Sequence, residues 1–257
     1  LFLAGIIPGL LMCVTLMGVE YTISKKRGYG GDAPSSMKEI FSSFKSSILA
    51  LLMPLIILGG IYGGIFTPTE AAVVAVFYGV IIGLFAYKEL NFKKIMDILQ
   101  NSGKSTAVIL YLVATAHIFS YILASEQIPQ QLAQLMLGVS SNPLMIQFMI
   151  MVALLFAGTF LDNAVAIVLL TPIFYPITTQ VGIDPIFFGV LMVFALAIGQ
   201  VTPPVGLCLF VACNISKVSI EKLSKAVIPF LVALIALLVV LNLIPDVILY
   251  IPRHAVF

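Results

Sequence analysis

Two short stretches rich in polar, glycine and proline residues interrupt long apolar runs, and they carry residue types suited to ion binding. The first is residues 158–163 (GTFLDN), and the second is residues 199–204 (GQVTPP). Non-helical backbone at membrane depth is tolerated only where protein buries it or where it lines a cavity. Two such breaks, one with a carboxylate, predict an ion- or substrate-binding site inside a membrane, and therefore a transporter.

The first stretch predicts the tip of a helical hairpin, in which one helix ends near Gly158 and the next begins near Asn163. Helix C-terminal carbonyls suit Na⁺, whereas a helix N-terminus offers N–H groups to a carboxylate. Thr159 and Asn163 add neutral oxygens, and backbone carbonyls can supply most ligands of a hard cation. Asp162 either caps the second helix or serves the site. Because an intramembrane carboxylate costs about 2.5–3.5 kcal/mol, the second interpretation is favoured.

The second stretch predicts a broken helix. Gly199 permits a turn, while Pro203 and Pro204 remove two N–H donors and push Thr202 out of helical geometry. Carbonyls about one turn earlier, near Gly199 and Gln200, should then lose their helical partners and become available to Na⁺. The alternative is a proline kink whose carbonyls are satisfied by neighbouring helices. The nearby hairpin favours the ion site.

The composition excludes a water-soluble fold. Of the 257 residues, 61% are hydrophobic and only 9% are charged, against about 25% charged in soluble domains. The apolar runs are long and lack the alternation of porin strands, so they predict helices. The chain is therefore expected to be an all-α polytopic membrane protein in contact with the lipid bilayer, with no nucleic-acid partner.

The elements that would position these stretches follow from the apolar runs. A basic, glycine-rich loop that contains residues 25–27 and 30–34 is expected after the first span. Residues 66–70 (FTPTE) interrupt the run 48–87, with Glu70 favoured as a helix cap over a functional carboxylate. Expected spans cover residues 3–23, 48–87 (two spans), 106–123, 143–177 (the hairpin), 185–214 (the broken helix) and 227–244. Amphipathic helices are expected at 36–46 and 88–104, and a short helix at 129–137.

Basic residues predict the topology. No Lys or Arg lies between Lys104 and Lys217, so the three basic loops at 25–45, 88–104 and 217–225 should be cytoplasmic. The connections 124–142 and 178–184 should then face outward. The hairpin would start and end outside, and its arms of about 15 residues favour a re-entrant hairpin over two crossings.

Several motifs resemble a known family. Residues 64–72 (GIFTPTEAA), the Asp162-Asn163 pair, residues 200–206 (QVTPPVG) and residues 1–9 (LFLAGIIPG) together resemble the large membrane subunit of tripartite ATP-independent periplasmic (TRAP) transporters. The resemblance implies an ion-transporter-superfamily-like fold with two inverted repeats, of which this chain would hold only the second. It divides the chain into a scaffold (1–104), a transport region (105–216) and a C-terminal span (217–257).

The resemblance also implies a function. That function is Na⁺-coupled, elevator-type uptake of organic acids such as C4-dicarboxylates or sialic acid across the bacterial inner membrane. The implied partners are a small membrane subunit and a periplasmic substrate-binding protein. The implied sodium ligands are Gly158, Thr159, Asn163, Gly199 and Thr202, and the implied substrate contacts are Asp162, Asn163, Thr202 and Pro203. The sequence does not separate these two sets.

Three other functions remain as alternatives. A related stand-alone Na⁺/anion symporter would need no binding protein, and a structural membrane subunit would bind no Na⁺. An intramembrane aspartyl protease needs two facing carboxylates, and Asp162 has no evident second membrane carboxylate as its partner. The chain is therefore not expected to be an enzyme.

Overall fold

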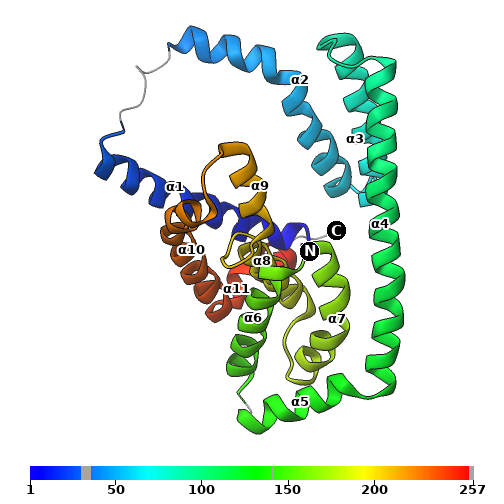
Figure 1. The fold of residues 1–257 in the computed structure, drawn as a ribbon, viewed down its shortest axis with the longest axis vertical. Coiled ribbons are helices and arrows are strands. Elements are labelled where there is room, and N and C mark those ends of the chain that lie inside the picture. Colours follow the sequence, from blue (N-terminus) through cyan, green and yellow to red (C-terminus); the bar gives the residue numbers. More distant parts are fainter. Residues whose placement is uncertain (30–35, 141, 255–257) are drawn as a thin grey trace. The chain divides into compact units, whose positions relative to one another are not determined.

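A computed structural model describes residues 1–29, 36–140 and 142–254, and these residues form helices and no strand (Figure 1). Seven of the helices are long and apolar enough to cross a membrane. The all-α polytopic class predicted from the composition is thus confirmed. The predicted loop is wrong at residues 25–27, which form the last turn of α1, and its residues 30–34 lie outside the described residues. The helices are α1 (Ile6–Arg27), α2 (Met37–Tyr62), α3 (Pro68–Ile81), α4 (Phe92–Ser125), α5 (Ile128–Val139), α6 (Pro143–Phe160), α7 (Asn163–Gln180), α8 (Pro185–Gln200), α9 (Leu207–Ser216), α10 (Ile220–Leu243) and α11 (Pro245–His254).

The chain forms two compact units. One contains residues 1–29 and 109–257, and the other contains residues 30–108. This division reflects packing, whereas the predicted division at residues 104 and 216 concerns which regions move and bind. That division of roles stays a prediction.

In the smaller unit, α2 and α3 pack together, and the Tyr78 hydroxyl on α3 donates to the Leu49 carbonyl on α2 at 2.7 Å. The predicted break at 66–70 is confirmed, because α2 ends at Tyr62 and α3 begins at Pro68. Thr67 caps α3: its hydroxyl accepts the Glu70 N–H at 3.3 Å, and Glu70 Oε2 accepts the Thr67 N–H at 2.8 Å. This reciprocal capping box confirms the structural role favoured for Glu70.

Three predicted helix boundaries are wrong. The last span was predicted to begin at residue 227, after a polar connector at 220–226, but both belong to α10, which begins at Ile220. The amphipathic segment at 36–46 and the span after it form one helix, α2, and the segments 88–104 and 106–123 form the 34-residue helix α4. The change from polar to apolar composition suggested boundaries, but no proline or glycine pair enforces one. Gly103 alone costs a helix only about 1 kcal/mol, so the helix continues through it.

In the larger unit, α8 is the central element. It packs against α6, α7, α10 and α11, and its Ala195 and Leu196 are fully buried. Helix α1 packs against α10. Helix α11, which was not predicted, is short and contains Pro252, and it buries Ile248 and Leu249.

The hairpin and the broken helix both form, with longer hairpin arms than predicted. Helices α6 and α7 have 18 residues each, not about 15, and each is long and apolar enough to cross a membrane. At 1.5 Å per residue, each arm extends about 27 Å. Arm length therefore does not separate a re-entrant hairpin from two crossings, and the re-entrant arrangement stays a prediction.

Candidate ion-binding site

The hairpin tip is a very short connection. Helix α6 ends at Phe160 and α7 begins at Asn163, so only Leu161 and Asp162 lie between the two helices. Asp162 is the N-cap of α7, and its Oδ1 accepts the Ala164 N–H at 2.9 Å. The Asp162 side chain is exposed. One N–H of the α7 N-terminus is thus already bound by the chain's own carboxylate.

The second break lies between α8 and α9, over residues 201–206. The Thr202 N–H donates to the Gly199 carbonyl at 2.9 Å, and the Val201 N–H donates to the Ile198 carbonyl at 3.2 Å. These short-range bonds tighten the end of α8. The prediction that the Gly199 carbonyl loses its partner is therefore wrong. In the described part of the chain the Gln200 carbonyl accepts no hydrogen bond, as predicted.

The two breaks meet in space through bare backbone. A methyl group built on Gly199 would lie 2.6 Å from the Gly158 Cα, and one built on Gly158 would lie 2.8 Å from the Leu196 carbonyl oxygen. Only glycine permits α6 and α8 to approach this closely. The predicted residues Gly158 and Gly199 are thus adjacent, although 41 positions separate them in the sequence.

One hydrogen bond ties the hairpin tip to the end of the second break. The Gly206 N–H donates to the Thr159 carbonyl at 3.0 Å, and Gly206 has a φ of +54°, which favours glycine. Gly206 was not among the predicted site residues. A sequence signal for Gly206 does exist: it follows two prolines and precedes the next helix. The first N–H groups of a helix have no partner within that helix, so a residue at this position needs an acceptor elsewhere.

The two site threonines present oxygen lone pairs. The Thr159 hydroxyl donates to the Phe156 carbonyl at 2.7 Å, and the Thr202 hydroxyl donates to the Ile198 carbonyl at 2.7 Å. Each proton is thus directed at a carbonyl of the preceding helical turn, in α6 for Thr159 and in α8 for Thr202, and the lone pairs remain free to accept. Thr159 is only 5% exposed.

Three further oxygens at the site have no partner among the described residues. Asn163 Oδ1 is buried and unbonded, and the carbonyls of Gly158 and Gln200 accept no hydrogen bond. A buried polar atom is normally bonded, so the Asn163 oxygen calls for a partner, whereas unpaired carbonyls are usual in the last turn of a helix. Pro203 is half-buried and can offer only its carbonyl. The possible ligands at this site are therefore uncharged oxygens, and hard cations bind oxygen ligands.

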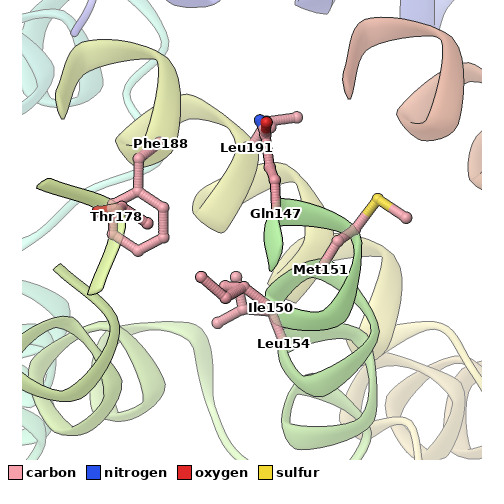
Figure 2. A pocket seen from close by; sticks show the side chains of 7 residues that line it. All are labelled: Gln147, Ile150, Met151, Leu154, Thr178, Phe188 and Leu191. Atoms are coloured by element: carbon pink, nitrogen blue, oxygen red, sulfur yellow. The ribbon is translucent and has the colours of Figure 1, made fainter. Parts of the chain in front are cut away.

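A separate cavity of about 10 Å³ lies along α6, away from the tip (Figure 2). Gln147, Ile150, Met151 and Leu154 of α6 line one side, with Thr178, Phe188 and Leu191 contributed by α7 and α8. A volume of about 10–15 Å³ holds one water molecule. This cavity is therefore too small for an organic acid, although the buried Gln147 Nε2 has no bonding partner in the described residues.

Comparison with known proteins identifies the family. The sequence matches the family described as the tripartite ATP-independent periplasmic transporter, DctM component, over residues 1–247. The chain is 44% identical to the isethionate TRAP transporter permease protein DctMQ of Oleidesulfovibrio alaskensis, over 96% of this chain and 39% of the relative. It is 42% identical to the sialic acid TRAP transporter large permease protein SiaM of Vibrio cholerae, over 98% of this chain and 59% of the relative.

A third relative has a different named substrate. The chain is 38% identical to the C4-dicarboxylate TRAP transporter large permease protein DctM of Pseudomonas aeruginosa, over 98% of this chain and 59% of the relative. The chain thus spans between about two fifths and three fifths of the length of these curated relatives. It is a multi-pass inner-membrane protein, and its relatives are transporters and not enzymes. The chain belongs to the DctM family of TRAP transporter permeases.

Proposed function

We propose that the chain is part of the large permease subunit of a TRAP transporter that couples Na⁺ entry to uptake of a small organic anion. The relatives' names include sialic acid, C4-dicarboxylates and isethionate. The first two carry carboxylates and the third carries a sulfonate. The substrate class shared by these names is therefore a small organic anion, broader than carboxylates alone.

One observation supports the sodium assignment: the two backbone breaks meet at Gly158 and Gly199, and both breaks carry neutral oxygens with free lone pairs. Five such oxygens are available, from the carbonyls of Gly158 and Gln200, the hydroxyls of Thr159 and Thr202, and the amide of Asn163. Hard cations are commonly held by such oxygen sets. In this proposal Gly199 positions the site through packing and provides no ligand.

We propose that Asn163, Thr202 and Pro203 contact the organic anion. An ionised Asp162 repels an anion, and its carboxylate already occupies the Ala164 N–H. Asp162 therefore acts in this proposal by fixing the start of α7. Uptake would proceed by elevator-type movement, with a small membrane subunit and a periplasmic substrate-binding protein as partners.

Equilibrium binding of radioactive Na⁺ to the purified chain tests the proposal, with K⁺ as competitor. We expect saturable Na⁺ binding that Thr159→Val weakens and that K⁺ does not displace at equal concentration. Absence of saturable binding by a folded chain would contradict the sodium assignment and would favour a structural membrane subunit instead.

A further inference from the structure

A groove of about 380 Å³ lies between α1 and α10, outside the candidate ion site. Thr15, Gly18, Val19, Thr22 and Ile23 line it from α1, and Pro229 lines it from α10. The two helices pack together directly in one compact unit. The groove is open along most of its surface, so a molecule bound there would lie against the two helices and would not be enclosed by them.

The lining of the groove suits hydrocarbon. Its two hydroxyls are already bonded, since Thr15 donates to the Leu11 carbonyl at 2.8 Å and Thr22 to the Gly18 carbonyl at 2.7 Å. A methyl built on Gly18 would contact nothing within 4 Å. The groove therefore offers methyl and methylene surface with room above Gly18, and no free donor faces a polar ligand.

Basic residues follow the groove lining along both helices. Lys26 lies four residues after Thr22, and Lys225 and Lys222 lie four and seven residues before Pro229. Helical periodicity places residues at these spacings on the same faces as the groove lining. Lys25 and Arg27 flank Lys26 in the last turn of α1.

These basic side chains are exposed and lack a carboxylate partner. Within residues 1–29, 36–140 and 142–254, the one ion pair joins Arg253 to Asp246. Glu20 on α1 and Glu221 on α10 are the nearby acidic residues, so the five basic residues leave a net charge of +3. These basic residues lie in segments predicted to be cytoplasmic, where anionic headgroups attract basic residues.

We propose that this groove binds one anionic phospholipid, with an acyl chain along Gly18 and the phosphodiester between Lys26, Lys222 and Lys225. Charge complementarity selects the headgroup, and the apolar groove holds the chain. A basic pocket between membrane helices at the cytoplasmic side is a known arrangement for such lipids. The proposal is independent of the sodium assignment, because it uses none of the residues of the ion site.

The chain contains no tryptophan, so a single introduced tryptophan reports on one location. Ile23→Trp places the reporter in the groove, and Tyr21→Trp places a matched control at similar depth on a side chain that is 68% exposed and outside the groove lining. Each variant of the full chain is reconstituted with brominated phosphatidylglycerol or brominated phosphatidylcholine, and fluorescence quenching is measured.

We expect phosphatidylglycerol to be preferred several-fold at Ile23→Trp and to show no preference at Tyr21→Trp. Removing Lys26 and Lys225 by substitution with glutamine should lower the preference by roughly fivefold per charge. Equal quenching by both lipids at the groove reporter, or the same preference at both reporters, would overturn the proposal.

A second variant distinguishes lipid binding in the groove from attraction of anionic lipid by the basic residues alone. Gly18→Phe fills the groove and leaves every charge in place, while Gly138→Phe, at an exposed position on α5 with open space around it, is the control. In the Ile23→Trp background, Gly18→Phe should abolish the preference and Gly138→Phe should preserve it. A preference that survives Gly18→Phe shows attraction by charge alone and refutes the lipid site.

Discussion

Replacing Gly199 by alanine should move α6 away from α8 and weaken Na⁺ binding. The added methyl would lie 2.6 Å from the Gly158 Cα and 2.8 Å from the Leu155 carbonyl oxygen, both of which are backbone atoms. Carbon atoms in contact lie about 3.5–4.0 Å apart, so the helices must separate by roughly 1 Å. Overpacking of this kind costs about 1–3 kcal/mol.

A displacement of this size matters for a cation, because ligand distances must hold to about 0.2 Å. We expect the Na⁺ dissociation constant to rise at least tenfold. At a Na⁺ concentration of 100 times the original constant, binding stabilises the chain by about 2.7 kcal/mol, and a tenfold weaker site gives about 1.4 kcal/mol. Thermal unfolding across a Na⁺ titration measures this difference.

Gly138→Ala is the matched control, because a methyl there meets open space on an exposed helix. It should not lower the Na⁺-free melting temperature, because alanine favours a helix over glycine, and it should leave the Na⁺ midpoint unchanged. A Gly199→Ala chain that melts lower but keeps the original Na⁺ midpoint would refute the positioning argument while leaving the packing argument intact.

Three further substitutions test single contacts. Thr202→Val removes one site oxygen and should weaken Na⁺ binding about tenfold, whereas Thr202→Ser should keep the affinity; equal affinities in Na⁺ titrations would exclude the hydroxyl as a ligand. Asp162→Ala should lower the free energy of unfolding by about 1 kcal/mol and reduce Na⁺-driven uptake by the assembled transporter, whereas Asp162→Asn, which can still cap α7, should restore both. Loss of uptake in both variants would show that the charge acts directly. Glu70→Ala breaks the capping box with Thr67 and should lower the free energy of unfolding in denaturant by about 1 kcal/mol. The Na⁺ midpoint should not change, and a shifted midpoint would link α3 to the site.

The local chemistry of the site could be predicted, because at both breaks glycine stands close to a second residue that disfavours a continuous helix, Asp162 in one and the pair Pro203-Pro204 in the other. The breaks at 158–163 and 199–204 were predicted from these residues alone, and both occur in the structure. The contact between Gly158 and Gly199 could not be predicted in the same way. Membrane helices are apolar on all sides, so periodicity does not show which faces meet.

Two errors have the same physical origin. A change from charged to apolar sequence marks where a helix enters the membrane, and it was interpreted as the end of one helix and the start of another. Helices α2 and α4 continue through that change because backbone hydrogen bonding depends little on side-chain polarity. The start of a helix is better predicted by its cap, as the box between Thr67 and Glu70 at the start of α3 shows.

The neutrality of the proposed ligands suggests how ion and anion binding could be coupled. A site built from carbonyl, hydroxyl and amide oxygens gains a full positive charge when Na⁺ enters, whereas a carboxylate ligand would cancel that charge. In a medium of low dielectric constant the remaining charge attracts an organic anion strongly. By linkage, the anion then strengthens Na⁺ binding by the same factor. Placing a carboxylate among the ligands, as in Asn163→Asp, should therefore tighten Na⁺ binding and weaken the mutual enhancement. Anion binding that remains equally Na⁺-dependent in that variant would show that the coupling has a different origin.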